Sequence, residues 1–255
     1  MSRERRDKAL FDAIATRYAR KDTVPSSAQA RQYQLLTALR PLLAQKDNLG
    51  TVVDIGCGVG APAAFLAGRY RRYIGVDQSE EMIRAAAQFN RHLPHVEFIA
   101  ANVKSETIPD DIADVILSVG ALHHMTALDD VMRNLVRVAK PGAALLVVEP
   151  QNGNPFIQVM RRLRGFLDQG YSREQKFFSE EQLRALFGRH GITRLTVDYQ
   201  AFLTPPFAQV ILPPQAITAP LSRLAIRADQ WVHGRLRGRL RQLSFNIVLH
   251  GIFTK

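Results

Sequence analysis

A run of apolar residues that ends in an acid and then in glycines is the part of this sequence that most clearly carries chemistry. Residues 52–60 read VVDIGCGVG. The apolar start predicts a β-strand. The glycines Gly56, Gly58 and Gly60 predict a tight turn, where a ligand can approach the backbone because no Cβ stands in the way. A strand, a glycine-rich turn and then a helix is the arrangement of a nucleotide-cofactor site.

The acid in this run distinguishes two cofactors. The pattern Gly56-x-Gly58-x-x-Ala61 also fits the dinucleotide fingerprint, so an NAD(P)-dependent oxidoreductase is one interpretation. Asp54 stands two residues before the first glycine, where it would repel a pyrophosphate and attract an ammonium group. S-adenosylmethionine has an ammonium group and no phosphates. A second apolar run ends in Asp77, an acid that can accept hydrogen bonds from the ribose hydroxyls of either cofactor.

Two adjacent histidines follow a later apolar run, DVILSVG. Sites of α/β proteins form at the carboxyl ends of parallel strands, so His123 and His124 are expected near the ligand. Histidine titrates near neutral pH, and one of the two could act as a general base toward a hydroxyl group or an activated carbon. Local packing is the alternative for both.

The elements that must position these residues follow from the pattern between residues 51 and 150. Five apolar runs alternate there with helical patterns, which is typical of βα units and a parallel sheet. The runs are TVVDIG, RYIGVD, VEFIAAN, DVILSVG and ALLVVEP. The helical stretches between them are Ala61–Arg69, Ser79–Asn90 and Leu128–Val138, and the last is expected to stop at KPG, residues 140–142.

The C-terminal third predicts further elements. Residues 156–166 are expected to form a basic helix, and Ser179 with Gln182 forms a capping box that opens another helix, with Gly191 as its stop. Two strand-like runs, ITRLTVDYQAFL and SFNIVLHGIF, follow, and 40 residues separate them. This gap is far longer than a hairpin connection, so we predict an insertion with its own structure.

Residues 51–150 resemble the core of the class I S-adenosylmethionine-dependent methyltransferases of the type-11 group. Five blocks match in order: VVDIGCGVG, YIGVDQSEEMI, VEFIAANV, DVILSVGALHHM and LVRVAKPGAALLVVEP. The core is also similar to the ubiquinone/menaquinone-biosynthesis C-methyltransferases, whose motif FDxIAxxY is echoed in FDAIATRY at residues 11–18. The resemblance implies S-adenosylmethionine as the cofactor.

The resemblance also implies the fold, an α/β protein with a Rossmann-like class I methyltransferase sheet. An N-terminal helical cap and a helical insertion before the last strand would be added to it. The expected parts are a cap at 1–50, a cofactor-binding core at 51–202 and 244–255, and an insertion or lid at 203–243.

By the same resemblance, a defined set of residues forms the cofactor site. They are Asp54, Gly56, Cys57, Gly58, Gly60, Asp77, Gln78, Met82, Asn102, Val103, Ser118 and Val119. Asp54 and the glycines would line the methionine part, and Asp77 would bind the ribose. Gln78 and Met82 would flank the adenine. The family usually has Asp where this chain has Asn102, whose amide can still bond the edge of the adenine.

The reacting end of the site would lie beside the fourth strand. Ser118 and Val119 would present their backbone next to the sulfonium. The catalytic candidates are His123 and Tyr18, whose counterpart in the family lies over the cofactor; for Tyr18, simple packing is the alternative. Methyl transfer mainly requires alignment and exclusion of water. No metal is expected, because the cluster of oxygen ligands that metal-assisted O-methyltransferases need is not recognisable near Asp114.

Charge is distributed unevenly along the chain. The net charge is +11, yet residues 51–150 carry 9 basic and 12 acidic side chains, so the basic excess lies in the flanks. An anionic partner is therefore expected there. Residues 203–243 hold six arginines and one acid. The candidates for contact with an anionic membrane surface are Arg235, Arg237, Arg239 and Arg241, and a solvated helix face is the alternative.

Nucleic acid is not the expected partner. Enzymes that methylate exocyclic amino groups of bases commonly carry an Asn/Asp-Pro-Pro-aromatic motif after the fourth strand, whereas this chain has SVGA at residues 118–121. Base-C5 methylation uses a cysteine nucleophile, and the single cysteine, Cys57, lies in the cofactor loop. One cysteine gives no disulfide framework, and the N-terminus has no apolar targeting segment. We expect a cytoplasmic protein, with peripheral contact at the inner membrane surface as an option.

The combined interpretation is S-adenosylmethionine-dependent O- or C-methylation of a small or lipid-like molecule. An NAD(P)-dependent oxidoreductase and a non-catalytic protein that binds S-adenosylmethionine or lipid are the alternatives.

Overall fold

The computed structural model describes residues 3–154, 158, 177–236 and 238–255. Within these residues seven strands form one sheet in the order β3-β2-β1-β4-β5-β7-β6. Strands β1 to β5 are parallel, and β7 runs antiparallel between β5 and β6. The strands are β1 Thr51–Ile55, β2 Arg72–Asp77, β3 Val96–Ala100, β4 Ala113–Val119, β5 Ala139–Pro150, β6 Ile192–Gln200 and β7 Asn246–Phe253.

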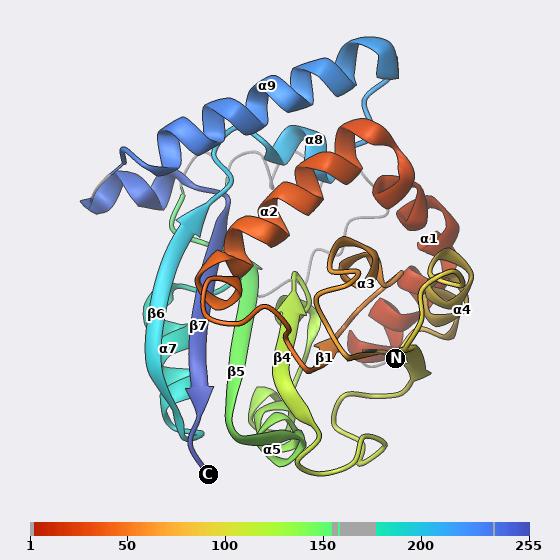
Figure 1. Cartoon of the computed structure of the whole chain (residues 1–255), viewed down its shortest axis with the longest axis vertical. Coiled ribbons are helices and arrows are strands. Elements are labelled where there is room, and N and C mark those ends of the chain that lie inside the picture. The colour runs from red at the N-terminus through yellow and green to blue at the C-terminus, as the bar shows by residue number, and fades with distance from the viewer. Residues whose placement is uncertain (1–2, 155–157, 159–176, 237) are drawn as a thin grey trace.

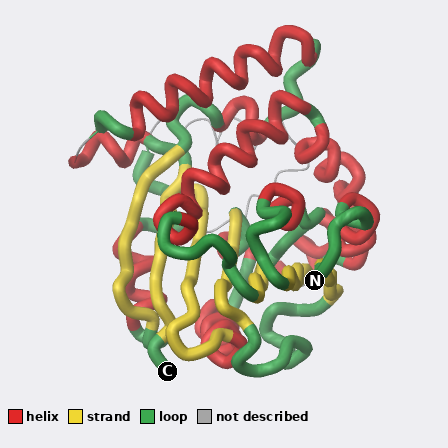
Figure 2. The backbone as a smooth tube through the Cα atoms, viewed as in Figure 1, coloured by secondary structure: helices red, strands yellow, loops and turns green. Residues whose placement is uncertain are grey.

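Helices cover both faces of the sheet and its carboxyl edge (Figures 1 and 2). The α-helices are α1 Arg3–Thr23, α2 Pro25–Leu43, α3 Ala61–Phe65, α4 Glu80–Phe89, α5 Leu128–Val138, α7 Glu180–Gly188, α8 Pro205–Gln209 and α9 Gln215–His233. Two 3₁₀ helices are η1 Leu122–His124 and η2 Gly238–Leu243. The predicted basic helix at 156–166 lies outside the described residues, apart from Gln158.

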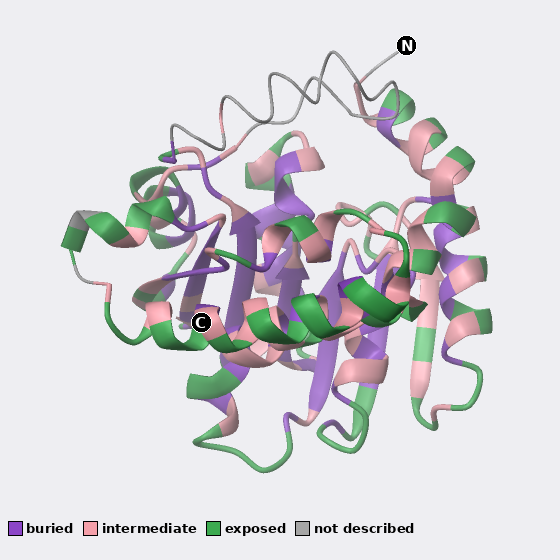
Figure 3. Cartoon of the chain, turned by 90° about the horizontal axis from the view of Figure 1, so that it is seen from above, coloured by how far each residue is buried: buried purple, intermediate pink, exposed green. Residues whose placement is uncertain are grey.

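Alternating side chains of the central strands supply two cores. Val53 and Ile55 pack with α5 and α7 on one face, whereas Val52 packs with α2 and α3 on the other. Strands buried on both faces need apolar residues at every position, which explains the uninterrupted runs in the sequence. Figure 3 shows the middle of the sheet buried and the outer helix surfaces exposed.

The sequence located most elements, with two differences in detail. Helix α3 ends at Phe65 rather than Arg69, and the chain then turns through Gly68 at φ +79°. Residues 140–142, predicted to stop α5, lie inside β5. The pairing there shifts from Ala113 with Ala139 to Val115 with Ala144, so the extra residues form a bulge in the strand. The capping box of Ser179 and Gln182 is present at the start of α7.

The N-terminal helices and the segment between β6 and β7 pack together above the carboxyl edge of the sheet. The Ser222 hydroxyl donates to the carbonyl of Ser26 at 2.7 Å, and Gln29 donates to the carbonyl of Ala219 at 2.7 Å. These bonds hold α9 against α2, with α9 outermost (Figure 1). No helix among the described residues is long and apolar enough to cross a membrane.

One buried acid organises the start of this inserted segment. Asp229 of α9 is 1% exposed. Its carboxylate accepts backbone N–H groups of Phe202, Leu203 and Thr204 at 3.0, 2.6 and 3.1 Å. The one acid of the arginine-rich segment therefore serves the fold.

Candidate functional site

A cavity of about 1100 Å³ lies at the carboxyl edge of the sheet, beneath α1, α2 and α8. We call one part the cofactor half, lined from within residues 54–62, 76–82 and 101–104. We call the other the acceptor half, lined from within residues 202–212 and 243–246 with parts of α1, α2 and 148–154. Tyr18 and His123 line the cavity as well.

The glycine-rich turn shapes the cofactor half, but only two of its three glycines line it. Gly56 and Gly58 have φ of +70° and +54°, which L side chains rarely adopt. A Cβ on Gly58 would project into the cavity, where its nearest neighbour would be Tyr18 Cε1 at 4.0 Å. Gly60 does not line the cavity. A Cβ there would lie 2.5 Å from the ring of Phe98, so this glycine serves close packing. Its predicted contact with the cofactor stays a prediction.

Asp54 presents a buried carboxylate to the cavity. One of its oxygens accepts a hydrogen bond from the hydroxyl of Tyr73, while Oδ1 has no hydrogen-bond partner among the described residues. Burial, with the nearby carboxylate of Asp77, raises the pKa of Asp54 to about 7. An unpartnered buried carboxylate oxygen fits a ligand ammonium group, which would supply the missing hydrogen bond and charge.

Asp77 stands at the end of β2 beside the same turn. Its two oxygens accept the backbone N–H groups of Gly58 and Ser79, both at 2.9 Å. Burial raises its pKa above the ordinary value, and these N–H groups oppose the rise. A carboxylate offers about four acceptor positions, so ribose hydroxyls can still donate to it.

The far end of the cofactor half is formed by Gln78, Met82, Asn102 and Val103, as predicted. Asn102 is exposed, and its side-chain oxygen accepts the N–H of Lys104 at 3.0 Å. Its amide N–H₂ is left to donate to an adenine ring nitrogen.

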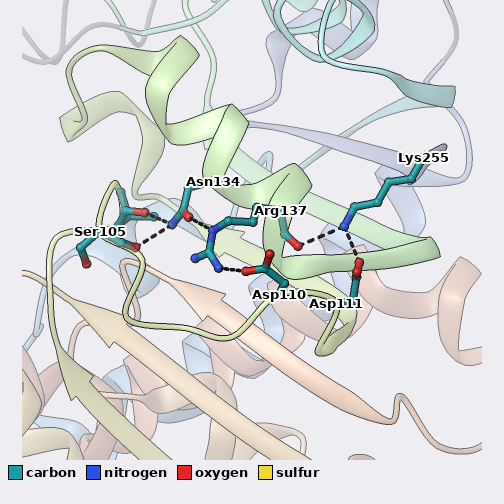
Figure 4. Close-up of polar contacts among 7 residues, drawn as sticks. Ser105, Asp110, Asp111, Asn134, Arg137 and Lys255 are labelled. Atoms are coloured by element: carbon teal, nitrogen blue, oxygen red, sulfur yellow. Dashed lines mark hydrogen bonds and ion pairs between the residues drawn. The ribbon is translucent and has the colours of Figure 1, made fainter.

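Helix α5 anchors the loop that carries Asn102 and Val103 (Figure 4). Asn134 donates to the carbonyls of Val103 and Ser105. Arg137 bonds Asn134 at 2.8 Å and pairs with Asp110. These contacts fix the backbone after β3 beside the cavity.

Two predicted residues behave differently at the end of β4. Val119 lines the cavity, whereas Ser118 is fully buried and does not. The contact predicted for Ser118 is through its backbone, so that assignment stays a prediction. Cys57 lines the cavity as a packed side chain; burial raises its thiol pKa well above the ordinary value, which keeps it protonated and a poor nucleophile.

His123 is held by an acid that the sequence interpretation missed. Its Nδ1 lies 2.6 Å from Glu149 Oε2, and both residues are buried. Glu149 Oε1 accepts the backbone N–H groups of Ala121 and Leu122 at 3.0 and 2.8 Å. With Nδ1 engaged, Nε2 is the ring nitrogen left for a ligand in the cavity. Glu149 ends the apolar run ALLVVEP, and an acid at that position of a parallel strand was the available signal.

A comparison with known families shows which class of domain contains this site. Residues 53–147 match the family described as "Methyltransferase domain". Residues 53–147 are therefore a methyltransferase domain. S-adenosylmethionine is therefore the cofactor of the domain, as predicted. Asp54 fits its ammonium group and Asp77 fits its ribose. The open turn at Gly58 leaves room for its methionine part.

Curated relatives of the methyltransferase domain support this result. The chain is 36% identical to trans-aconitate 2-methyltransferase of Azoarcus over 137 residues, which are 50% of this chain and 51% of the relative. It is 28% identical over 176 residues, 63% of this chain and 72% of the relative, to a ubiquinone/menaquinone biosynthesis C-methyltransferase of Syntrophotalea carbinolica. The chain spans about half the length of the first curated relatives it matches.

Solved structures confirm the class I methyltransferase fold. A S-adenosylmethionine-dependent methyltransferase of Thermotoga maritima, described as a possible histamine N-methyltransferase, aligns with a TM-score of 0.67 at 20% identity, covering 96% of this chain and 98% of that one. The strand order also argues against the oxidoreductase alternative, because the dinucleotide-binding fold has the order 3-2-1-4-5-6 and no antiparallel strand between its last two positions.

Helix α1 closes the cofactor half of the methyltransferase domain from outside. Ser79 donates to Asp12 at 2.6 Å, and Lys104 bonds Glu4 at 2.6 Å. His124 takes part in this closure: its ring packs edge-on against Phe11 at 5.0 Å, and burial lowers its pKa, so it is neutral at pH 7. His124 also lines the cavity, next to His123.

Tyr18 lies where α1 passes over the glycine-rich turn. The cations of Lys21 and Arg31 stand 4.9 and 5.5 Å from its ring centre. Arg31 is also paired with the buried Asp22 at 2.5 Å. Tyr18 thus lines the cavity beside the glycine-rich turn, and its ring is held between cations. Its catalytic role stays a prediction.

The acceptor half has mainly apolar walls. Its aromatic, proline and aliphatic residues are Phe177, Phe202, Pro205, Pro206, Val210, Leu212, Leu243 and Phe245. Polar side chains are fewer, and Gln34 and Asn246, which meet at 3.5 Å, are among them. No group of three or more His, Cys, Asp or Glu among the described residues could hold a metal ion.

Proposed function

We propose that this chain transfers the methyl group of S-adenosylmethionine to a hydroxyl oxygen or an activated carbon of a small, largely apolar acceptor. The observation that carries the proposal is the pair of His123 and Glu149 at the junction of the two cavity halves. A buried histidine fixed by a carboxylate is the arrangement of a general base.

Each residue has a defined task in this reaction. S-adenosylmethionine, when bound, supplies an electrophilic methyl group on a sulfonium. Asp54 holds the ammonium group of the cofactor and Asp77 its ribose, and together they aim that methyl group toward the acceptor half. His123 Nε2 takes the proton of the acceptor as the new bond forms. Glu149 keeps the proton of the neutral ring on Nδ1 and stabilises the protonated ring that results.

The walls of the acceptor half favour an aromatic or lipid-like acceptor. Phe177 stacks on the ring of His123 with 5.7 Å between ring centres, so a flat acceptor could lie beside both. Relatives include C-methyltransferases of ubiquinone and menaquinone biosynthesis, which supports a quinol-like or phenol-like molecule. A carboxylate acceptor, as in the trans-aconitate relative, is already ionised, so it has no proton for a general base to remove.

The test is a screen of purified protein with labelled S-adenosylmethionine and a panel of quinols, phenols, fatty acids and small carboxylates, with products identified by mass. We expect transfer to a phenolic or quinolic acceptor. Transfer confined to carboxylates, or binding of S-adenosylhomocysteine without any transfer across the panel, would contradict the proposal; the second result would favour the non-catalytic alternative.

A further inference from the structure

Helix α9 carries an apolar stripe on its outer surface. Ile217, Leu221, Leu224 and Trp231 are 58, 48, 61 and 59% exposed. Their spacings of four, three and seven residues place them on one side of the helix. The opposite side, with Thr218, Ser222 and Asp229, is buried against the rest of the protein. The stripe is thus the outer side of an amphipathic helix whose inner side is already occupied.

The charges beside the stripe are all positive. Arg223 and Arg227 are exposed, and neither forms an ion pair with a described residue. Arg235, just after the helix, is exposed and stands 4.3 Å from the ring centre of Trp231. The only acid of α9, Asp229, is buried, and its carboxylate already accepts hydrogen bonds from backbone N–H groups. An apolar stripe flanked by unopposed cations matches an anionic interface.

These cations are not the set predicted from sequence. Arg241 is half-buried and paired with Asp198, so it is not available as expected. Arg237 lies outside the described residues, as does the side chain of Arg239. Of the four predicted arginines, only Arg235 is among the exposed cations described beside the stripe.

The acceptor half of the cavity reaches the surface beside this helix. Val210 precedes α9 in the chain and Leu243 follows it. Both line the cavity, and they are 44 and 50% exposed. Exposed apolar side chains therefore lie both on α9 and at the edge of the cavity.

We propose that the outer surface of α9 docks on a membrane rich in anionic phospholipid, with the apolar stripe in the interface and Arg223, Arg227 and Arg235 at the headgroups. A second copy of the chain is a poorer occupant. A symmetric contact between two such stripes would bring their arginines together without acids to oppose them. The inference stands on α9 and does not depend on the proposed function.

Trp231 is the only tryptophan of the chain, so its fluorescence reports on this surface directly. Full-length protein is mixed with vesicles of phosphatidylcholine alone or with phosphatidylglycerol, at low and high salt. We expect a blue shift of the emission, quenching by brominated lipid and co-sedimentation with the anionic vesicles at low salt. High salt should weaken all three, because the headgroup attraction is screened.

Two variants and a matched control localise the contact. Arg223→Gln with Arg227→Gln should weaken partitioning by about fivefold for each arginine. Leu221→Ser with Leu224→Ser should weaken it by about tenfold or more. Arg84→Gln with Arg91→Gln changes the same net charge on exposed residues at and after α4, and should leave partitioning unchanged. Binding of S-adenosylhomocysteine by each variant verifies the fold.

Three results would overturn the proposal. One is unchanged Trp231 emission with anionic vesicles. Another is equal loss of partitioning in the control variant. The third is a stable dimer whose formation shields Trp231 from acrylamide, which would make α9 an interface between copies.

Discussion

The two halves of the cavity are built in opposite ways. The cofactor half uses short contiguous segments at the ends of β1, β2 and β3, and much of its chemistry comes from backbone and from two carboxylates. The acceptor half uses side chains from α2, from the segment before α8 and from the segment before β7. The first half suits a constant ligand held by fixed groups, and the second suits an acceptor that can differ from one relative to the next.

This contrast predicts that substitutions in the cofactor half change cofactor affinity. We expect the largest effect, a loss of kcat, at the junction of the two halves. His123→Ala should lower kcat by about a hundredfold or more, because the proton of the acceptor loses its base. The affinity for S-adenosylhomocysteine, measured by calorimetry, should stay nearly the same. Equal activity in the variant would leave His123 as a packing residue and turn attention to Tyr18.

Glu149→Gln tests the same pair through its positioning residue. We expect a smaller loss of kcat than in His123→Ala, with the KM for the acceptor and the affinity for S-adenosylhomocysteine nearly unchanged, because an amide can still orient the ring but does not oppose its positive charge as a carboxylate does. A purely structural role for Glu149 would lower the melting temperature without this selective loss of kcat.

A substitution inside the cofactor half should act on affinity instead. Asp54→Asn is expected to weaken S-adenosylhomocysteine binding at pH 8 by about 2–3 kcal/mol, since a charged hydrogen bond to the ammonium is lost. Asp130→Asn, which changes an exposed acid of α5, is the matched control. Affinity in Asp54→Asn equal to wild type would remove Asp54 from the site.

The smallest effect is a dependence on pH that only the cofactor half should show. The pKa of Asp54 is about 7 without ligand, so below that pH a proton must leave before the carboxylate can pair with the ammonium. Affinity should fall by up to about tenfold per pH unit below 7 and level off above it. The ligand-free protein should lose stability as pH rises from 4 to 7, because the unfolded chain releases the Asp54 proton near pH 4 whereas the folded protein holds it up to about pH 7. Both trends should vanish in Asp54→Asn.

The sequence predicted the cofactor half well because its signals are local. The strand, the turn and the acid stand within a few residues of one another, so the sequence alone shows that they lie close together. Asp54 and Gly58 are examples. Gly60 shares the turn but packs against Phe98, and Ser118 is buried next to Val119, so neither of the two lines the cavity. A local pattern places a residue near the site, and only the packing shows whether it faces the cavity.

The acceptor half was beyond such reasoning. Gln34 and Asn246 meet although 212 residues separate them, and no pattern near either predicts the contact. The sequence groups Arg241 with other arginines that have no acid nearby in the chain. In the structure, Asp198 of β6 lies beside Arg241 and pairs with it. Charge in a sequence shows where cations are, and only tertiary structure shows which of them are already neutralised.

The bond between His123 and Glu149 has a consequence for the charge balance of the whole site. In the proposed reaction, methyl transfer removes one positive charge from sulfur, and His123 gains one when it takes the proton. His123 is paired with the buried Glu149, so the new cation forms beside a buried anion. The total charge enclosed by the protein is the same before and after the reaction. S-adenosylhomocysteine keeps the ammonium and ribose assigned to Asp54 and Asp77, so the product loses only the charge on sulfur, and His123 must return its proton to solvent before the next acceptor can be used.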